Sequence, residues 1–412
     1  MTSVRLAIFV VTYVLIAAQQ VPGVRVNRPA ASLLGAVAMV VLGGLPTQDA
    51  YAAIDIDVIV FLLGVLLLVA YLDLGGFFDL AAVWIAKRFR SPRAFLAGVI
   101  AASGLLSAIF LNDTVCLVFV PLVLAALEPL GVRPLPYLLG IAFAANVGSA
   151  MTITGNPQNM LIGISSGIAY RDFWALLAIP SLGGLAIVYG VLAFAFRRDL
   201  EQPFSARAAP PDDARPIDKG LVARALVLFG GALVAWLAGL SLPVVAIAAG
   251  ALMIAIGNRD PAAAFAKVEW SLLLFFASLF VVVRGVESAP VFVDLTARAA
   301  STLHGAPWHD ALVTSAAMTA LSNLVSNVPA VILWRPVVPH LPNARFIWLV
   351  MAMSSTFAGN LTLLGSMATL IVAERAAARG VHLRFGDVLR AGVPVTLLTL
   401  VWGVASLVWL AR

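Results

Sequence analysis

The sequence predicts an all-α, polytopic membrane protein made of two inverted-topology repeats. Of its 412 residues, 62% are hydrophobic and only 11% are charged, which is far from the composition of soluble domains. Apolar segments of about the 20 residues that a spanning helix needs recur along the whole chain. Two related patterns of polar residues, one in each half, interrupt these segments. We therefore expect helices throughout and exclude a soluble enzyme.

The charges and the cysteine content narrow the class of protein further. The net charge is +6, but the basic residues fall in short clusters between apolar segments, which indicates membrane topology and not a nucleic-acid partner. Cys116 is the only cysteine, so neither a disulfide framework nor a cysteine metal site is expected. The sequence contains no H-E-x-x-H or Walker A motif. We expect no enzyme, no ATP-driven pump, no metal site of this kind and no bound cofactor.

Hydropathy and length predict the helical segments. They are expected near 5–20, 30–46, 54–72, 94–111, 114–129, 136–169, 173–197, 220–239, 241–257, 268–286, 308–325, 328–341, 345–377 and 386–410. The segments 136–169 and 345–377 are too long for one plain crossing and carry glycine and hydroxyl residues near their centres. Each therefore predicts a discontinuous transmembrane helix. The pairs at 94–129 and 308–341 predict helical hairpins.

These segments divide the chain into a predicted scaffold and a transport domain. Residues 1–53 and 220–257 are expected to be scaffold helices, and 54–197 and 258–412 the two repeats. The stretch 198–219 is rich in proline and charge, which is typical of a linker between halves.

An internal repeat supports this division. NDTVCLVFVP at 112–121 corresponds to NVPAVILWRP at 327–336. VGSAMTITGNPQN at 147–159 corresponds to FAGNLTLLGSMAT at 357–369, which pairs Gly155 with Gly365. The predicted topology gives the two units opposite orientations, as in alternating-access transporters.

The distribution of Lys and Arg predicts the orientation in an inner membrane, because cytoplasmic loops carry the excess. If both termini lie outside and the linker 198–219 is cytoplasmic, most basic residues become cytoplasmic, including Arg25 and Arg28. The outside set is then Arg5, Arg171, Arg284, Arg298, Arg335, Arg345 and Arg412.

Polar residues at membrane depth predict the substrate and ion site. Gly155, Asn156 and Pro157 together would interrupt a helix, and the freed backbone groups need partners that lipid cannot provide. Half-helix N-termini favour anions, and C-terminal carbonyls favour cations. The candidate substrate- or ion-binding residues are Asn112, Asp113, Thr114, Ser149, Thr152, Thr154, Gly155, Asn156, Pro157, Asn159, Ser326, Asn327, Asn360, Thr362, Gly365, Ser366 and Thr369. Asn112 and Asn327 are candidates for holding Na⁺.

Asp113 is the candidate coupling residue, because a carboxylate between two apolar arms is costly and marks function. Burial would favour its neutral form and so suit a proton carrier, whereas bound Na⁺ would keep it ionised. A carboxylate neutralised by backbone donors at the hairpin tip is the structural alternative. Its counterpart in the second repeat is Val328, so the two tips differ in chemistry.

The chain resembles the ion transporter superfamily, in its ArsB/NhaD permease branch, which includes arsenite and anion permeases and citrate transporter-like domains. ANVGSAMTITGNPQNMLIG (145–163) is similar to the first broken helix of that family, and LSNLVSNVPAVIL (321–333) and GNLTLLGSMATLIVAE (359–374) are similar to arsenite permeases. The resemblance implies a transport domain that moves against a scaffold, and a homodimer. Sodium-coupled dicarboxylate relatives carry Ser-Asn-Thr at both tips, whereas this chain has Asn112-Asp113-Thr114 and Ser326-Asn327-Val328.

Three functions follow from these observations. The first is a permease that moves a small anion or oxyacid, such as arsenite or a carboxylate, coupled to a H⁺ or Na⁺ gradient. A Na⁺/H⁺ antiporter and an anion channel are the alternatives. The expected partners are a small-ion substrate and the lipid bilayer, with no nucleic acid.

Overall fold

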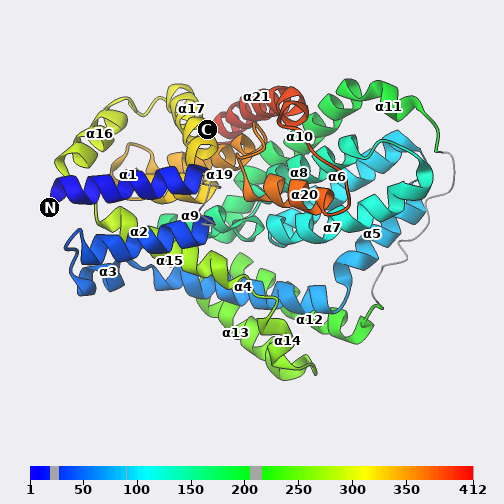
Figure 1. Cartoon of the computed structure of the whole chain (residues 1–412), viewed down its shortest axis with the longest axis horizontal. Coiled ribbons are helices and arrows are strands. Elements are labelled where there is room, and N and C mark those ends of the chain that lie inside the picture. The colour runs from blue at the N-terminus through cyan, green and yellow to red at the C-terminus, as the bar shows by residue number, and fades with distance from the viewer. Residues whose placement is uncertain (19–26, 90, 205–215, 412) are drawn as a thin grey trace.

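The computed structural model describes residues 1–18, 27–89, 91–204 and 216–411, and every regular element in these ranges is a helix (Figure 1). The first half contains α1 (Thr2–Ala18), α2 (Arg28–Val41), α3 (Thr47–Ala53), α4 (Ile56–Leu74), α5 (Phe77–Arg88), α6 (Pro92–Ile109), α7 (Asn112–Leu127), η1 (Glu128–Leu130), α8 (Leu135–Ser149), η2 (Ile153–Gly155), α9 (Pro157–Ser166), α10 (Tyr170–Ala195) and α11 (Arg197–Glu201). The second half contains α12 (Lys219–Leu237), α13 (Leu242–Ile256), α14 (Pro261–Phe265), α15 (Trp270–Arg284), α16 (Pro290–Ser301), α17 (Pro307–Val325), α18 (Asn327–Trp334), η3 (Val338–His340), α19 (Ala344–Ala358), α20 (Met367–Ala377) and α21 (Phe385–Leu410). The predicted all-α class is confirmed.

Local sequence signals determine where several helices begin. Asn27, Ser91 and Asp260 each accept a hydrogen bond from a backbone amide of the following turn, and a proline occupies N1 or N2 of each helix. Such capping satisfies amides that have no partner within the helix, and proline costs little there because its missing N–H would be unpaired anyway. Among the described residues, six helices are long and apolar enough to cross a membrane.

The internal repeat extends over the whole chain. The order of elements from α1 to α10 recurs from α12 to α21, and α10 and α21 each have 26 residues. The predicted scaffold segments 1–53 and 220–257 belong to this repeat as well, because α1 to α3 correspond to α12 to α14. The recurring order of helices therefore includes helices outside the predicted units 54–197 and 258–412.

Packing between the halves is reciprocal. Helix α2 of the first half packs on α15 of the second, and α13 of the second packs on α4 of the first. Likewise α7 packs on α20, and α18 packs on α9. Figure 1 shows α10 beside α21, which are themselves a corresponding pair in contact. A two-fold relation between the halves would produce these exchanges, which supports the predicted inverted repeats.

The structure adds elements that hydropathy did not predict. Helices α5 and α16 precede the two hairpins in corresponding positions, and each mixes charged with apolar residues, so neither stands out as an apolar segment. The predicted linker 198–219 begins within helix α11, and its centre, 205–215, lies outside the described residues.

The pair α1–α2 does not form two full crossings. Helix α2 has 14 residues, or about 21 Å at 1.5 Å per residue, against a hydrocarbon thickness of about 30 Å. At one end of the pair, Arg5 donates to the carbonyl oxygens of Gly43 and Gly44. At the other end, Tyr13 and Arg28 contact the α17–α18 hairpin. The pair therefore enters the molecule from one side and brings the start of α2 to that hairpin.

Candidate substrate site

The first discontinuous helix is broken between Ser149 and Pro157, as predicted. The carbonyl groups freed by the break accept hydrogen bonds from Asn159, whose Nδ2 lies 2.9 Å from the oxygen of Thr152 and 3.3 Å from those of Ser149 and Ala150. Asn156 caps the second half-helix by accepting from the amide of Asn159 at 2.8 Å. Asn159 and Asn156 thereby give partners to three carbonyl groups and one amide at the break, which lipid could not provide.

The second discontinuous helix is broken in the same way between Ala358 and Met367. Ser366 takes the place of Asn156 and accepts from the amide of Thr369 at 3.1 Å. Gly155 and Gly365 lie at corresponding positions, where the unwound chain passes close to its own first half-helix. A Cβ at Gly155 would lie 2.2 Å from the oxygen of Ser149, and a Cβ at Gly365 would lie 3.1 Å from that of Gly359 and 2.7 Å from Oδ1 of Asn323. Both glycines therefore allow the unwound chain to fold back on its own helix.

Asn146 joins the two broken helices, although the sequence did not single it out. Its Nδ2 donates to Oδ1 of Asn360 at 2.8 Å and to Oγ of Ser366 at 2.9 Å, and it lies 3.5 Å from Oγ1 of Thr369. Its exposed fraction is 0%. Asn146 lies in α8, a helix with apolar residues on all sides. The one sequence signal that could have identified it is its polar amide within this apolar segment.

Thr356 takes the position of Asn146 in the second repeat, and its hydroxyl accepts a reciprocal set of hydrogen bonds. Thr356 Oγ1 lies 3.5 Å from Nδ2 of Asn156 and 3.2 Å from Nε2 of Gln158. Each first half-helix thus holds the cap of the other repeat's second half-helix. The polar cluster at the centre of the molecule is therefore built equally by both repeats.

Each hairpin is tied to the unwound segment of its own repeat. Oγ1 of Thr152 donates to the carbonyl oxygen of Ala108 at the end of α6, and Oγ1 of Thr362 donates to Oδ1 of Asn323 near the end of α17 at 2.9 Å. At the tips, Asn112 donates to Oδ1 of Asn146 at 3.4 Å. The amide group of Asn327 donates to the carbonyl oxygens of Gly365 at 3.0 Å and Ser355 at 2.9 Å.

Asp113 lies in the first turn of α7 and is buried. Its position at a helix N-terminus favours the carboxylate through the helix dipole. The described part of the chain offers its carboxylate no hydrogen-bond or ion-pair partner, so the structural alternative, neutralisation by backbone donors, is not seen. Thr114 is half-buried beside it.

The remaining predicted residues also lie at this cluster. Oγ1 of Thr154 lies 2.9 Å from the hydroxyl of Tyr170 and 3.3 Å from Oγ1 of Thr152. Ser149 receives a hydrogen bond from Asn156 at 3.0 Å, and Pro157 begins α9. The structure therefore brings together the two hairpin tips and both breaks.

Arg28 lies at the site, where the sequence did not predict it. Its predicted location is a cytoplasmic loop, but its exposed fraction is 6%. Its Nη1 donates to Oγ of Ser326 at 3.1 Å and its Nη2 to the carbonyl oxygen of Leu364 at 3.3 Å. Arg28 therefore belongs to the site and not to the orientation count. Arg25 and Arg412, which that count also includes, lie outside the described residues.

Several buried polar atoms at the cluster have no hydrogen-bond partner among the described residues. They are Arg28 Nε, Asn112 Oδ1, Asn159 Oδ1, Ser322 Oγ and Ser355 Oγ. Buried polar groups are normally paired, so these atoms remain free to contact a solute or water.

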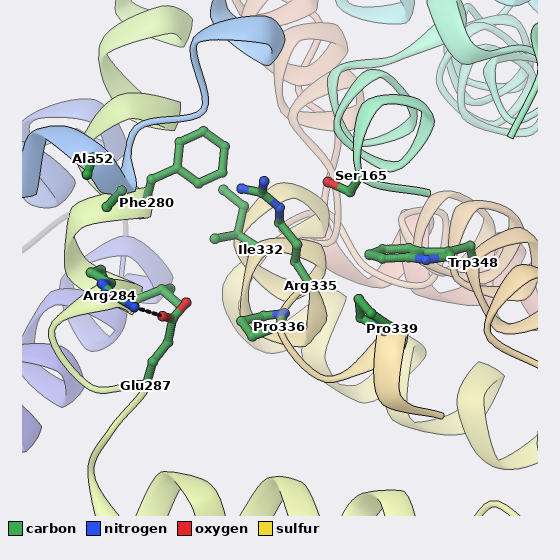
Figure 2. Close-up of a pocket in the computed structure, with 12 residues that line it drawn as sticks. Ala52, Ser165, Phe280, Arg284, Glu287, Ile332, Arg335, Pro336, Pro339 and Trp348 are labelled. Atoms are coloured by element: carbon green, nitrogen blue, oxygen red, sulfur yellow. Dashed lines mark hydrogen bonds and ion pairs between the residues drawn. The ribbon is translucent and has the colours of Figure 1, made fainter. Parts of the chain in front are cut away.

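A cavity of about 510 Å³ lies on the α18 side of this cluster, lined by residues of α3, α9, α15, α18 and α19 (Figure 2). Its two arginines are both paired: Arg284 with Glu287 at 3.1 Å, and Arg335 with Asp55. Arg335 also stacks over Phe280, with 5.1 Å from its Cζ to the ring centroid.

A cavity of about 410 Å³ lies between the end of α7 and the end of α20. The two cavities flank the cluster in roughly corresponding positions of the two repeats.

Comparison with known proteins identifies relatives over the full chain. The family model described as citrate transporter matches residues 13–358. A 46 kDa membrane protein of Mycobacterium leprae is 30% identical over 97% of this chain and 96% of its own. The silicon efflux transporter LSI3 of Oryza sativa subsp. japonica is 29% identical over 96% and 95%, and a transporter named arsB of Dictyostelium discoideum is 23% identical over 94% and 88%.

Among solved structures, the YdaH transporter of Alcanivorax borkumensis has the same fold, with a TM-score of 0.54 and 18% identity over 98% of this chain and 96% of that one. The resemblance to the ArsB/NhaD branch is confirmed by these findings.

Proposed function

This chain belongs to the citrate transporter family of the ArsB/NhaD superfamily, a family of multi-pass membrane proteins, and we propose that it is a secondary active transporter for a small anion or oxyacid. The solute class includes arsenite and carboxylates, and a H⁺ or Na⁺ gradient supplies the energy by alternating access. The family and its members support transport, because the family is described as citrate transporter and the relatives are named silicon efflux transporter and arsB.

The observation that carries the proposal is the polar cluster that both repeats share. Asn146 crosses from α8 to the cap of α20, and Thr356 crosses from α19 toward the cap of α9. The amide N-termini of α9 and α20 meet at this cluster, and such N-termini favour negative charge. Alternating-access transporters typically bind their solute between two repeats.

Asp113 is the residue we assign to coupling. A buried carboxylate without a fixed partner can take up and release a proton, or can hold Na⁺ together with amide oxygens. The unpaired Oδ1 of Asn112 beside it suits Na⁺, which prefers oxygen ligands. We keep both ions as candidates, with Asn327 the second amide in the Na⁺ arrangement.

Uptake into proteoliposomes containing the purified full chain tests this function. We expect saturable uptake of citrate, sulfate or arsenite that rises when an inward H⁺ or Na⁺ gradient is imposed and falls when an ionophore collapses it. Sodium flux linked to protons in the absence of any anion would instead identify a Na⁺/H⁺ antiporter. Unsaturable flux independent of both gradients would identify a channel.

A further inference from the structure

The two hairpin tips have different electrostatic surroundings, although the chain is built from repeats. In the first repeat, the tip carries Asp113, and its counterpart in the second repeat is Val328. The second tip instead receives a positive charge from outside its own hairpin, because Arg28 of α2 donates to Ser326. A carboxylate at one tip thus faces a guanidinium at the other side of the same cluster.

The position of Arg28 is specific to one half of the molecule. Helices α2 and α13 correspond, and the residue that begins α13 is Leu242. Around that end of α13, aromatic rings fill the space next to the first hairpin. The ring centroids of Phe110 and Phe229 lie 4.9 Å apart, and the stacked rings of Trp236 and Tyr170 have centroids 5.6 Å apart. One side of the pseudo-symmetric core is therefore sealed by apolar rings, and the other contains a buried cation.

The guanidinium is incompletely paired. Its two contacts are to neutral oxygens, the hydroxyl of Ser326 and the carbonyl of Leu364, and no ion pair to Arg28 occurs in the part of the chain that the structure describes. Its Nε has no acceptor. The carboxylates of Asp113 and Glu374 act on Arg28 from a distance, without bonding it. A buried guanidinium needs hydrogen-bonded partners, so the free Nε leaves a contact that an anionic group of a solute fits.

The surroundings of Arg28 are suited to a solute. The hydroxyl oxygens of Ser322 and Ser355 are buried without partners in the same region. Ser326 has φ 76° and ψ 163°, a conformation almost restricted to glycine, and such strain concentrates at functional sites. Leu364, whose carbonyl Arg28 contacts, is 40% exposed, whereas every residue of the corresponding break at 150–156 is buried.

We propose that Arg28, carried into the membrane by the α1–α2 pair, binds an oxyanion group of the transported solute against the Ser326 tip. The ligand class is an anion with carboxylate or inorganic oxyanion oxygens, which match the planar donors of a guanidinium. This inference rests on the proposed transport function and makes it more specific: it requires a charged solute.

The test compares charged and uncharged solutes in proteoliposomes. Citrate and sulfate are the anionic probes, and arsenous and orthosilicic acids are the uncharged probes at pH 7. For the anion that the wild type carries, Arg28→Gln is expected to raise KM at least tenfold, and Arg28→Lys to raise it less because the charge remains while the fork of donors is lost. Transport of an uncharged probe should keep its KM in both variants.

A matched control comes from the other end of the same helical pair. Arg5→Gln makes the same chemical change at a residue whose guanidinium contacts Gly43 and Gly44, away from the cluster, and should leave KM unchanged. If Arg28→Gln does not fold, as judged by its melting temperature, Arg28→Lys alone carries the test.

Three results would overturn the assignment. They are an unchanged anion KM in both folded Arg28 variants, equal losses for charged and uncharged probes, and a wild type that carries only uncharged acids. In these cases the transporter itself stands. A wild type that moves none of the probes would contradict the proposed function as well.

Discussion

At the residue scale, the fold depends on a few side chains that compensate for broken helices. Asn159 satisfies three carbonyl groups and Asn146 bridges the repeats. Because these amides are buried, replacing one leaves its buried partners unpaired, so they are harder to substitute than surface amides.

The coupling role of Asp113 predicts the effect of removing its titratable group. Asp113→Asn resembles the protonated side chain permanently, so a proton-coupled carrier should lose the pH dependence of its uptake while still binding solute. Initial uptake rates measured between pH 5.5 and 8.5 in wild type and variant provide the test. The charges of Arg28 and Glu269 also act on this carboxyl, so Arg28→Gln is measured in parallel. An unchanged pH profile in Asp113→Asn would contradict this role.

Gly155 provides a prediction about packing. A methyl group there would lie 2.2 Å from the carbonyl oxygen of Ser149, so Gly155→Ala must displace backbone and should lower the free energy of unfolding by about 1–3 kcal/mol. At Gly230 in α12, a methyl group would have no neighbouring atom within 4 Å, so Gly230→Ala is the control and should be neutral or stabilising. Thermal unfolding in detergent measures both variants, and equal melting temperatures would refute the close approach.

At the scale of elements, the breaks in the helices were predictable and their partners were not. Gly155, Asn156 and Pro157 lie together in the sequence, and so their effect on a helix is local. The bridge from Asn146 to Ser366 joins residues far apart in the chain, and an amide in an apolar helix gives no sign of its partner. The predicted location of Arg28 was wrong for the same reason: hydropathy treats α2 as a crossing helix, whereas its start is determined by the α17–α18 hairpin.

The reciprocal bridges predict equivalent couplings. Double-mutant cycles for Asn146→Ala with Ser366→Ala, and for Asn156→Ala with Thr356→Ala, should each give a favourable coupling of about 0.5–3 kcal/mol. The coupling energy of the first pair should be larger, because its hydrogen bond from the amide nitrogen to the hydroxyl oxygen is 2.9 Å long, whereas that of the second pair is 3.5 Å long. Asn146→Ala combined with Ser406→Ala, whose hydroxyl bonds only its own helix, should be additive. Additivity in both bridging cycles would contradict the shared cluster.

At the scale of the whole molecule, two pseudo-symmetric halves exchange elements around a polar centre. Composition alone predicted the membrane class. A chain with so many apolar and so few charged residues cannot cover its apolar side chains with a polar surface, so lipid must cover them. The repeat of the scaffold helices α1 to α3 in α12 to α14 was not predicted, since apolar residues are interchangeable and leave little sequence similarity.

The predicted orientation gives a test with single cysteines. In a Cys116→Ala background, which removes the only native cysteine, the test uses Gln202→Cys in the linker and Ser301→Cys at the end of α16, because both positions are exposed. A membrane-impermeant maleimide added to intact spheroplasts should label position 301 and spare 202, and inverted vesicles should give the reverse. Labelling of both positions from the same side would contradict the proposed topology.

The most direct measurement is an experimental map of the full chain in lipid nanodiscs with a solute that it transports. We predict density for the solute between the breaks at 150–156 and 359–366, within contact distance of the Ser326 tip and of residues from both repeats. Solute density confined to the cavity between Phe280 and Trp348, or outside the molecule's polar centre, would contradict this prediction.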